Sequence, residues 1–411
     1  MASRSPAEMK QVLPPSIAGD EPGERAGSVF EPRFGAGDPF TLGVEEEYML
    51  LDRASLDLVQ HVESVLAAVS SADFEGRISG ELMQSVLEIA TPICAGPAEV
   101  ERQLRRLRAY VSEVAAGDDL RIGSAGTHPF SLFERQRITA MDRYQTLVDQ
   151  LQYVARRELI FGLHIHVAVD DADQAVQVVN GLLQHLGELV ALSASSPFWR
   201  GQPTGLSSVR QLIAGAGPRS GPPPRFHDYA DYAAVVDRLE RSGCIADYTE
   251  IWWDVRLQPR LGTIEIRVCD ATTTVEDSVA LSAYCQALVK HYCELYEDRT
   301  PIPECHRILT SENKWLAARY GLDAPLLDLS GEGHVRIPVR ESIERTLTAI
   351  APHARELGAD RELEGIRTIL ARGNSADGQL RAFASRGDIF DVAAYIAEQT
   401  RVRSGDAAAR P

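Results

Sequence analysis

Three consecutive glutamates inside an apolar segment constrain this chain more than any other feature. Residues 40–52, FTLGVEEEYMLLD, have the apolar and aromatic content of a β-strand. Strand side chains alternate between two faces, so Glu45 and Glu47 point one way and Glu46 the other. Two unpaired carboxylates on one buried face would cost several kcal/mol each. We therefore expect a positive partner there, most simply a divalent cation; the alternative is an exposed edge strand with a solvated acidic face.

The composition excludes several classes of protein. The 411 residues are 44% hydrophobic and 25% charged, which is typical of a globular protein with a sizeable core. The net charge of −17, from 42 basic and 59 acidic residues, argues against a nucleic acid or an anionic membrane as the main partner. Nucleotides stay possible ligands, because metal ions can screen the site locally.

Cysteine usage and the apolar segments predict a cytoplasmic location. The six cysteines contain no CxxC pair and are expected to be reduced thiols. The first residues lack the apolar core of a signal peptide. The most apolar helical run, 175–194, carries glutamine, histidine and glutamate, so we expect a packed helix there and no membrane span.

The order of the predicted elements indicates an α+β fold. Strands are expected at 40–52, in one or two pieces over 74–91, and at 120–124, 161–169, 250–257 and 262–269. Helices are expected at 56–70, 98–116, 142–157, 172–194, 231–242 and 275–297, then near 310–320, 339–350, 360–372 and 388–401. The helix at 98–116 is expected to expose Arg102, Arg105, Arg106 and Arg108. The strands precede a helical C-terminal part, which favours an antiparallel or mixed sheet over alternating βαβ units.

The sequence predicts one main domain between two tails. Residues 1–39 hold six prolines and five glycines with little apolar periodicity, which indicates a disordered or loosely attached tail. We expect a single domain over 40–403 and a short tail over 404–411. Within the domain, residues 215–225, GAGPRSGPPPR, predict a mobile loop near a site.

Several common enzyme motifs are absent. The chain has no GxxxxGK[ST] loop, no GxGxxG after a strand, no GxSxG and no HExxH. These absences argue against a P-loop enzyme, a dinucleotide fold, an α/β-hydrolase and a zincin.

Charged residues placed inside apolar strands indicate chemistry. They are Glu88 in SVLEIA, His164 and His166 in FGLHIHVAV, Asp254 and Arg256 in IWWDVRL, and Glu265 and Arg267 in GTIEIRVCD. Each alone has a structural explanation, such as a hydrogen-bonded core histidine or a solvated ion pair. Repeated over several strands, they predict one polar sheet face, which is stable only if its charges pair or coordinate ions.

The residue types on this face favour a particular ion. Mostly oxygen donors with an imidazole suit Mg²⁺ or Mn²⁺, whereas zinc prefers more histidine or cysteine. Carboxylates that hold metal, together with arginines, are also the equipment for phosphoryl transfer.

Several segments resemble one known family. They are GVEEEYMLLD, ELMQSVLEIATP, GLHIHVAV, SPFWRGQPTGLSSVR, IWWDVRLQPRLGTIEIRVCD and NKWLAARYGL. In order along residues 40–400, they closely resemble the carboxylate-amine ligases of the glutamate–cysteine ligase superfamily, specifically the bacterial type 2, or YbdK-like, group. The resemblance is more specific for the family than for a substrate, and it does not include residues 1–39.

The resemblance implies a fold and a reaction. The fold is a curved, mostly antiparallel sheet that forms a funnel with outer helices, related to the glutamine synthetase catalytic domain. The reaction is ATP- and Mg²⁺-dependent amide formation: a carboxylate attacks the γ-phosphate to give an acyl phosphate and ADP, and an amine then displaces phosphate. Glutamate is the expected donor and an amine such as cysteine the acceptor, in a homodimeric enzyme of 40–403 that acts on small molecules.

The resemblance also implies roles for individual residues. Metal ligands are expected at Glu45, Glu47, Glu81, Glu88, His164 and Glu265. Arg267 resembles the cation on the transferring phosphoryl group or the acyl substrate, and Glu265 resembles the carboxylate that bridges metals near the phosphates. Residues seven apart cannot share one face of a regular strand, so Glu81 must lie at a turn or bulge, which Ser79-Gly80 permits.

Further binding residues are inferred from chemistry. Arg210 and Arg256 could hold the α-carboxylate of an amino acid in a bidentate fork, and the alternative for Arg210 is a surface loop cation. Trp252 and Trp253 point to opposite faces, so at most one lines the pocket; we assign Trp253 to it. His166 is expected to orient a ligand. The helix near 310–320 carries the expected nucleotide contacts, Asn313, Lys314 and Arg319, which could instead form a solvated face.

Two other functions stay open at this point. A metal-lined funnel could activate water, as in a metal-dependent hydrolase of γ-glutamyl amides or an isomerase. A family member could also bind small molecules without turnover. The excess of acidic residues over histidines, and Arg267 beside Glu265, favour the ligase.

Overall fold

The computed structural model describes residues 32–69, 74–329 and 335–402. The expected tails therefore lie largely outside the described residues. The described part of the N-terminal segment packs on the main body, because the amides of Arg33, Gly35 and Phe40 donate to the carbonyls of Pro259, Val169 and Ala168.

Seven antiparallel strands form the large sheet of the described part. In the order β10-β11-β5-β1-β3-β2, with β4 also beside β1, they are Val255–Gln258, Thr263–Ile266, Leu163–Ala168, Leu42–Asp52, Val86–Ala90, Arg77–Gly80 and Leu120–Gly123. Three two-stranded pairs are added: β6 Phe198–Trp199 with β7 Gln202–Pro203, β8 Ser220–Gly221 with β9 Trp252–Trp253, and β12 Pro325–Leu327 with β13 Arg336–Pro338. β1 is the longest strand and lies near the middle of the sheet, so its side chains are the ones most enclosed by neighbours.

Helices occupy the connections and the C-terminal part. They are α1 Val62–Ala68, α2 Pro97–Gly117, α3 Asp142–Leu151, α4 Tyr153–Arg157, α5 Ala172–Leu182, α6 Leu186–Ser193, α7 Arg210–Ala214, α8 Tyr229–Arg241, α9 Val275–Glu297, α10 Arg307–Tyr320, α11 Val339–Glu356, α12 Asp360–Leu363, α13 Gly365–Arg372, α14 Ser375–Arg386 and α15 Ile389–Thr400. Short 3₁₀ turns lie at 133–135, 183–185, 248–250 and 321–323. None of the helices in the described ranges is both long and apolar enough for a transmembrane segment. The expected α+β fold with a large antiparallel sheet is confirmed.

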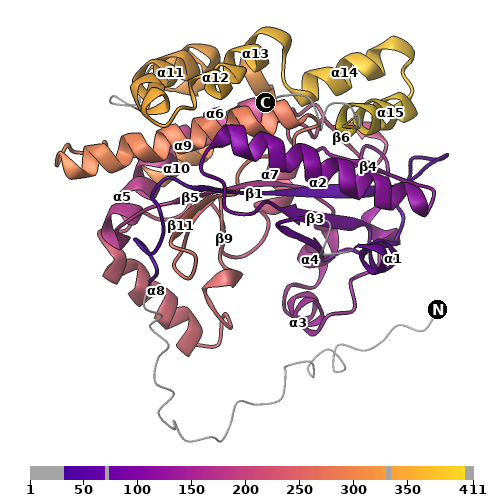
Figure 1. Cartoon of the computed structure of the whole chain (residues 1–411), viewed down its shortest axis with the longest axis horizontal. Coiled ribbons are helices and arrows are strands. Elements are labelled where there is room, and N and C mark those ends of the chain that lie inside the picture. The colour runs from indigo at the N-terminus through magenta and orange to yellow at the C-terminus, as the bar shows by residue number, and fades with distance from the viewer. Residues whose placement is uncertain (1–31, 70–73, 330–334, 403–411) are drawn as a thin grey trace, which may run out of the picture. The chain divides into compact units, whose positions relative to one another are not determined.

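The longest helices cover one face of the sheet in layers. Figure 1 shows α2 and α9 crossing the sheet beside β1, and α11, α12 and α13 lying on the far side of α9. α3, α4 and α8 lie on the opposite side of the sheet in this view. One face of β1 is therefore buried under helices, and the other faces the region bordered by α3 and the loops before β10.

The buried face of β1 carries an ion pair. Arg108 of α2 is 0% exposed and donates to Glu46 through Nε (2.8 Å) and Nη2 (2.6 Å). Ser278 of α9 also donates to this carboxylate, at 2.5 Å, and Tyr48 is a further donor. The expectation that Arg108 is exposed was wrong. Its position falls on the apolar stripe of α2, formed by Val100, Leu104, Leu107 and Val111, and not on the solvent face.

Other expected elements differ in their bounds. The helix expected at 56–70 begins only at Val62, because Asp52 caps a turn with Ser55 and Leu58 pairs with Leu51. The helix expected at 142–157 breaks at Gln152, whose φ is +49°. The helices expected at 172–194 and 360–372 are each interrupted, and α14 was not expected at all.

Candidate active site

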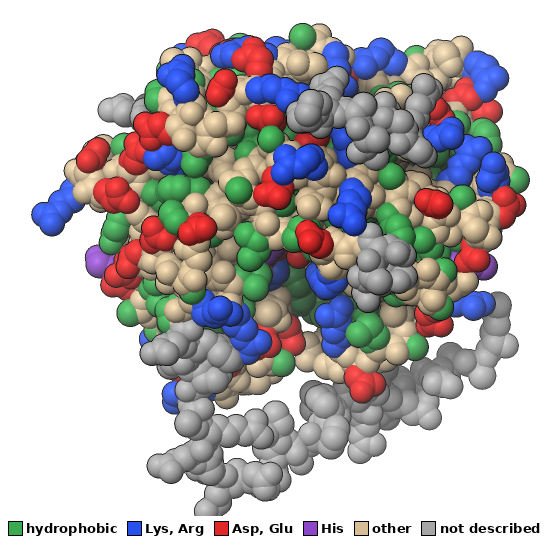
Figure 2. Space-filling view, in the orientation of Figure 1, with side chains coloured by type: hydrophobic (Ala, Val, Ile, Leu, Met, Phe, Trp, Pro, Cys, Tyr) green, Lys and Arg blue, Asp and Glu red, His purple; other side chains and the backbone are tan. Residues whose placement is uncertain are grey.

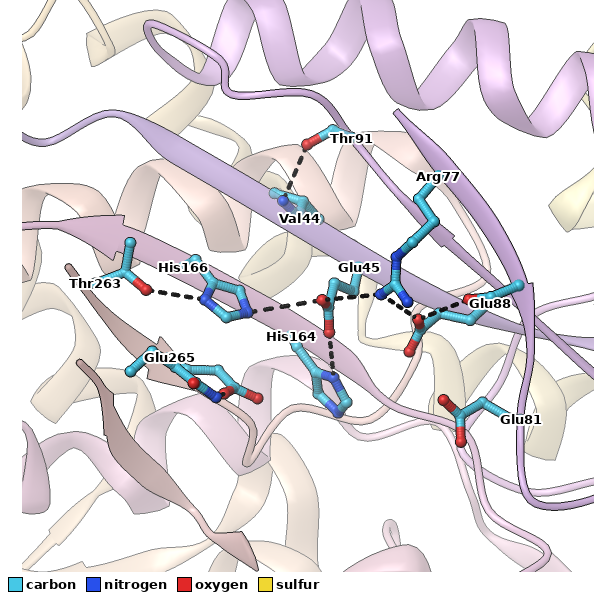
Figure 3. Close-up of polar contacts among 12 residues, drawn as sticks. Val44, Glu45, Arg77, Glu81, Glu88, Thr91, His164, His166, Thr263 and Glu265 are labelled. Atoms are coloured by element: carbon cyan, nitrogen blue, oxygen red, sulfur yellow. Dashed lines mark hydrogen bonds and ion pairs between the residues drawn. The ribbon is translucent and has the colours of Figure 1, made fainter. Parts of the chain in front are cut away.

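The register of the sheet places the predicted acidic residues on one face. Opposite residues in neighbouring antiparallel strands point to the same side. The pairs in which both residues are ionisable are Glu45 with His164, Glu47 with Glu88, His166 with Glu265, and Arg256 with Glu265. Figure 3 shows Glu45 in the middle of this face, between the two histidines and Glu88. These four registered pairs thus form a polar face opposite the buried one.

A cavity of about 620 Å³ opens over this face. In Figure 2 a hollow is visible below the helix layers, with basic side chains, in blue, beside it. Eight of the predicted site residues line the cavity: Glu45, Glu47, Glu81, Glu88, His164, Arg210, Arg256 and Arg267. The other six do not: His166, Trp253, Glu265, Asn313, Lys314 and Arg319.

Glu81 reaches the cavity from its edge. β2 ends at Gly80, so Glu81 lies in the turn that leads to β3, as its spacing from Glu88 predicts. The hydroxyl of Tyr144 on α3 lies 3.4 Å from its carboxylate. The turn therefore brings two acids seven residues apart into the same cavity.

The carboxylates of the cavity repel one another. Burial raises the pKa of Glu47 to about 7, and the charge of Glu81 adds to this. Burial also raises the pKa of Glu88 well above its ordinary value, with further contributions from Glu45, Glu81 and Glu47. Arg77 offsets only part of this repulsion, from 2.8 Å to Glu88 and 3.6 Å to Glu45. The pKa values of Glu47 and Glu88 therefore stay raised even though Arg77, Arg210 and Arg267 act on these carboxylates.

The two histidines hold Glu45 in its ionised form. Burial alone would raise the pKa of Glu45, but the hydrogen bond from His164 and the charge of His166 outweigh it, and the pKa falls to about 2. The Nδ1 of His164 lies 3.1 Å from this carboxylate. Burial and the nearby Arg267 lower the pKa of His164 to about 4. His164 is therefore a neutral imidazole at neutral pH, the form that binds metals.

Two groups of side chains in the described residues could hold a cation. They are Glu45 with Glu88 and His164, and Glu45 with His166 and Glu265, each with donor atoms within 4.8 Å of one another. Glu45 belongs to both groups, so one carboxylate could bridge two ions. Oxygen donors with one imidazole suit Mg²⁺ or Mn²⁺, and a cation would offset the repulsion described above. The residues present therefore fit a divalent cation.

Glu265 is already surrounded by donors. It is 1% exposed and accepts from Arg256 Nε at 2.8 Å, and also from Gln258 and Arg267. It thus holds Arg267 at the cavity wall. Arg256 uses its remaining donors on the carbonyls of Thr249 (2.9 Å) and Ile251 (2.6 Å). This changes the expectation for Arg256, whose fork is engaged within the protein instead of open to a substrate carboxylate.

Arg210 is a buried cation of the cavity wall and not a surface loop cation. It is the first residue of α7 and is 6% exposed. Its two terminal nitrogens donate to the carbonyls of Val268 and Arg267, each at 3.3 Å, and its Nε has no acceptor among the described residues. The charge of Arg210 also faces the buried Asp270, 3.8 Å from Nη1, so what the residue offers beside the cavity is mainly its unused Nε donor.

The two tryptophans point to opposite sides of β9, but the assignment to the pocket was reversed. Trp252 lines the cavity, with the guanidinium of Arg219 5.3 Å from its ring centre. Trp253 is 8% exposed and packs on Phe226, with ring centres 5.6 Å apart. Pairing with β8, formed by Ser220 and Gly221, sets this direction.

The three residues expected to contact a nucleotide are not brought together. Asn313 is buried, and its side chain forms hydrogen bonds with both the amide and the carbonyl of Leu327. These bonds join α10 to β12. Lys314 is buried in an ion pair with Asp254, at 2.6 Å, and Asp254 lines the cavity. Arg319 donates to the carbonyl of Gly205 away from the cavity. Of the three residues, only Lys314 is connected to the cavity, through its ion pair with Asp254.

Sequence reasoning missed several residues of the cavity. Arg77, Tyr144 and Glu158 line it, and none was assigned a role. Asp254 was noticed as a charge inside a strand, but its role was not assigned. Glu158 has one readable signal: it stands between two arginines and the apolar run LIF, where an acid is unusual.

Comparison with known proteins supports a single family. The family model "Glutamate-cysteine ligase family 2 (GCS2)" matches residues 41–395. A "Putative glutamate--cysteine ligase 2-3" of Rubrobacter xylanophilus is 44% identical over 370 residues, which are 90% of this chain and 99% of that protein. A "Putative glutamate--cysteine ligase 2" of Solibacter usitatus is 37% identical and covers 88% and 93%.

Solved structures with a similar fold have low sequence identity. The glutamate–cysteine ligase of Francisella tularensis, solved in complex with AMP, has a TM-score of 0.62 and 13% identity, over 90% of this chain and 91% of that one. A bifunctional glutathione synthetase from Pasteurella multocida has a TM-score of 0.65 and 16% identity, over 88% of this chain and 52% of that one. At these identities the likeness shows the fold alone.

The fold, the cavity and the sequence relatives define the class first: this is an ATP-dependent carbon–nitrogen ligase. The family match spans most of the chain, and the relatives match it over nearly their whole length. The chain belongs to glutamate–cysteine ligase family 2.

Proposed function

We propose that the protein joins an amino-acid carboxylate, the γ-carboxylate of glutamate, to an amine such as cysteine, with ATP and Mg²⁺ or Mn²⁺. The observation that carries this proposal is the convergence of Glu45, Glu47, Glu81 and Glu88 on one cavity. These carboxylates repel one another without a cation, and Arg210 and Arg267 are among the arginines that line the same cavity. The names of the relatives support the choice of glutamate and cysteine.

The proposed reaction has two steps. An oxygen of the donor carboxylate attacks the γ-phosphorus of ATP, the bond to the β-phosphate oxygen breaks, and ADP leaves. The resulting acyl phosphate is then attacked by the acceptor nitrogen, the carbon–oxygen bond breaks, and phosphate leaves. The products are an amide, ADP, phosphate and a proton.

The carboxylates and His164 would hold the cation beside the phosphates. When bound, Mg²⁺ neutralises phosphate oxygens and supports charge that develops during transfer. Arg267 faces the cavity from the end of β11, where it can stabilise the transferring phosphoryl group. Glu265 orients Arg267, a role for which its contacts give more support than direct metal binding.

Arg210 is the group we assign to a substrate carboxylate. Its charge is buried at the cavity wall and its Nε lacks an acceptor in the described residues. Trp252 replaces Trp253 as the aromatic group of the binding surface. We further propose that the polar face is the inside of a funnel of the glutamine synthetase type, and that the enzyme is a cytoplasmic homodimer.

Release of ADP tests the proposal. With glutamate and cysteine present, ADP should form only when Mg²⁺ or Mn²⁺ and ATP are supplied, in a one-to-one ratio with the amide. A screen of donor acids and amines, scored by the same assay, would define the substrates. Cleavage of γ-glutamyl amides without ATP would instead identify a metal-dependent hydrolase and refute the ligase.

A further inference from the structure

Glu158 is a cavity carboxylate without a protein partner. It follows α4 directly and lines the cavity. In the described ranges, no side chain or amide forms a hydrogen bond or ion pair with its carboxylate, unlike Asp254, which is paired with Lys314. Glu158 is only partly exposed, and a partly buried carboxylate without a protein partner is available to contact a ligand.

The charges that act on Glu158 are all basic. They are those of Arg267 and Arg210, which line the cavity, and of Arg157, its neighbour in the chain. Burial raises the pKa of Glu158 to about 7, and these arginines limit the rise. Glu158 thus lies near two arginines of the cavity wall, and no neighbouring carboxylate of the described residues raises its pKa further.

The proposed ligase reaction needs a group that accepts a proton. An acceptor amine arrives mostly as an ammonium ion, whose nitrogen has no lone pair for attack. The acids that would hold the cation cannot also take this proton, because protonation would weaken their hold on the metal. Glu158 is free of that duty and lies near Arg267, which would face the transferring phosphoryl group, and Arg210, which would hold a substrate carboxylate.

We propose that Glu158 is the general base that removes a proton from the acceptor ammonium, an inference that rests on the proposed ligase function. The carboxylate takes one proton, and the freed nitrogen lone pair forms the carbon–nitrogen bond. The bond between the acyl carbon and the phosphate oxygen breaks, and phosphate leaves with that electron pair and the second proton. Glu158 then returns its proton to solvent, so atoms and charge balance.

Two acceptors of different basicity test this role. Hydroxylamine is largely unprotonated at neutral pH and needs no base, whereas the amino group of cysteine is mostly protonated. Glu158→Gln should lower amide formation with cysteine by about 10²–10⁴-fold, while hydroxamate formation stays within about threefold of the wild type. The remaining rate with cysteine should rise with pH, because it depends on the free amine.

A matched control comes from Glu250, whose Oε2 also has no partner among the described residues and which also lines the cavity. Glu250→Gln should affect both acceptors equally or not at all. If Glu158→Gln lowers both products equally, or neither, Glu158 is not the base and the ligase function still stands. If the wild type makes neither product, the proposed function itself fails. Hydroxamate formation by Glu158→Gln also demonstrates that this variant is folded.

Discussion

The ion pair under β1 gives the sharpest prediction about stability. Replacing Arg108 by methionine keeps much of its volume but removes all its hydrogen bonds. Those bonds go to Glu46 (2.6 and 2.8 Å), to the hydroxyl of Tyr48 (3.0 Å), and to the carbonyls of Thr273 (2.9 Å) and Thr272 (3.3 Å). Glu46 would stay buried with only two hydroxyl donors, from Tyr48 and Ser278.

The cost follows from the unpaired charge. Breaking a buried pair by removing one partner costs about 3–5 kcal/mol. For a large domain, where 1 kcal/mol moves Tm by roughly 2 °C, Tm should fall by roughly 6–10 °C. Calorimetry of Arg108→Met measures this fall. Added salt should not restore stability, because a buried pair is little screened.

Two variants make the prediction refutable. The double variant Glu46→Gln with Arg108→Met has no buried charge and should recover about half of the loss or more. Arg102→Met lies on the same helix at the surface, 3.5 Å from Glu99, and should change stability by less than about 0.5 kcal/mol. A Tm of Arg108→Met within 2 °C or so of the wild type would refute the assigned role of the pair.

Two further predictions concern the cavity. The pKa of Glu47 is raised to about 7 in the folded protein, so the metal-free folded chain holds a proton there that the unfolded chain loses. The stability of the metal-free protein should therefore fall as pH rises toward 7. Mg²⁺ should raise Tm more at pH 8 than at pH 6. An equal gain at both pH values would contradict the assignment of Glu47 to the cation site. Trp252→Ala should raise KM with little change in Tm, whereas Trp253→Ala should cost about 3–5 kcal/mol of stability with KM unchanged. The reverse pattern, measured by steady-state kinetics and calorimetry, would show that the cavity-facing tryptophan is Trp253.

The acidic strand could be understood from sequence because strand geometry is local. Alternation alone placed Glu45 and Glu47 on one face and Glu46 on the other, and the contacts agree, because Glu45 and Glu47 line the cavity and Glu46 pairs with Arg108 of α2. The turn at Glu81 followed from the same parity rule. Such inferences need only the period of the element and no knowledge of its neighbours.

Errors arose where tertiary contacts decide the outcome. Position 108 lies on the apolar stripe of α2, three residues before Val111. The helical period alone therefore predicts that Arg108 is buried. Alternation predicted that Trp252 and Trp253 point to opposite faces, but it did not predict which face borders the cavity. The pairing of β9 with β8 decides this. The helix α14 was not expected, although Asn374 and Asp377 form a capping box at its start that the sequence pattern could have shown.

The adjacency of Glu45, Glu46 and Glu47 has a practical consequence for anyone who re-engineers this enzyme. Successive residues of β1 contact different parts of the protein. Glu46 contacts the helix layer, whereas Glu45 and Glu47 line the solvent-accessible cavity. A library that randomises 45 and 47 while leaving 46 intact changes the lining of the cavity and keeps the ion pair under the sheet. A one-residue insertion or deletion before position 45 would exchange the two assignments and lose both at once.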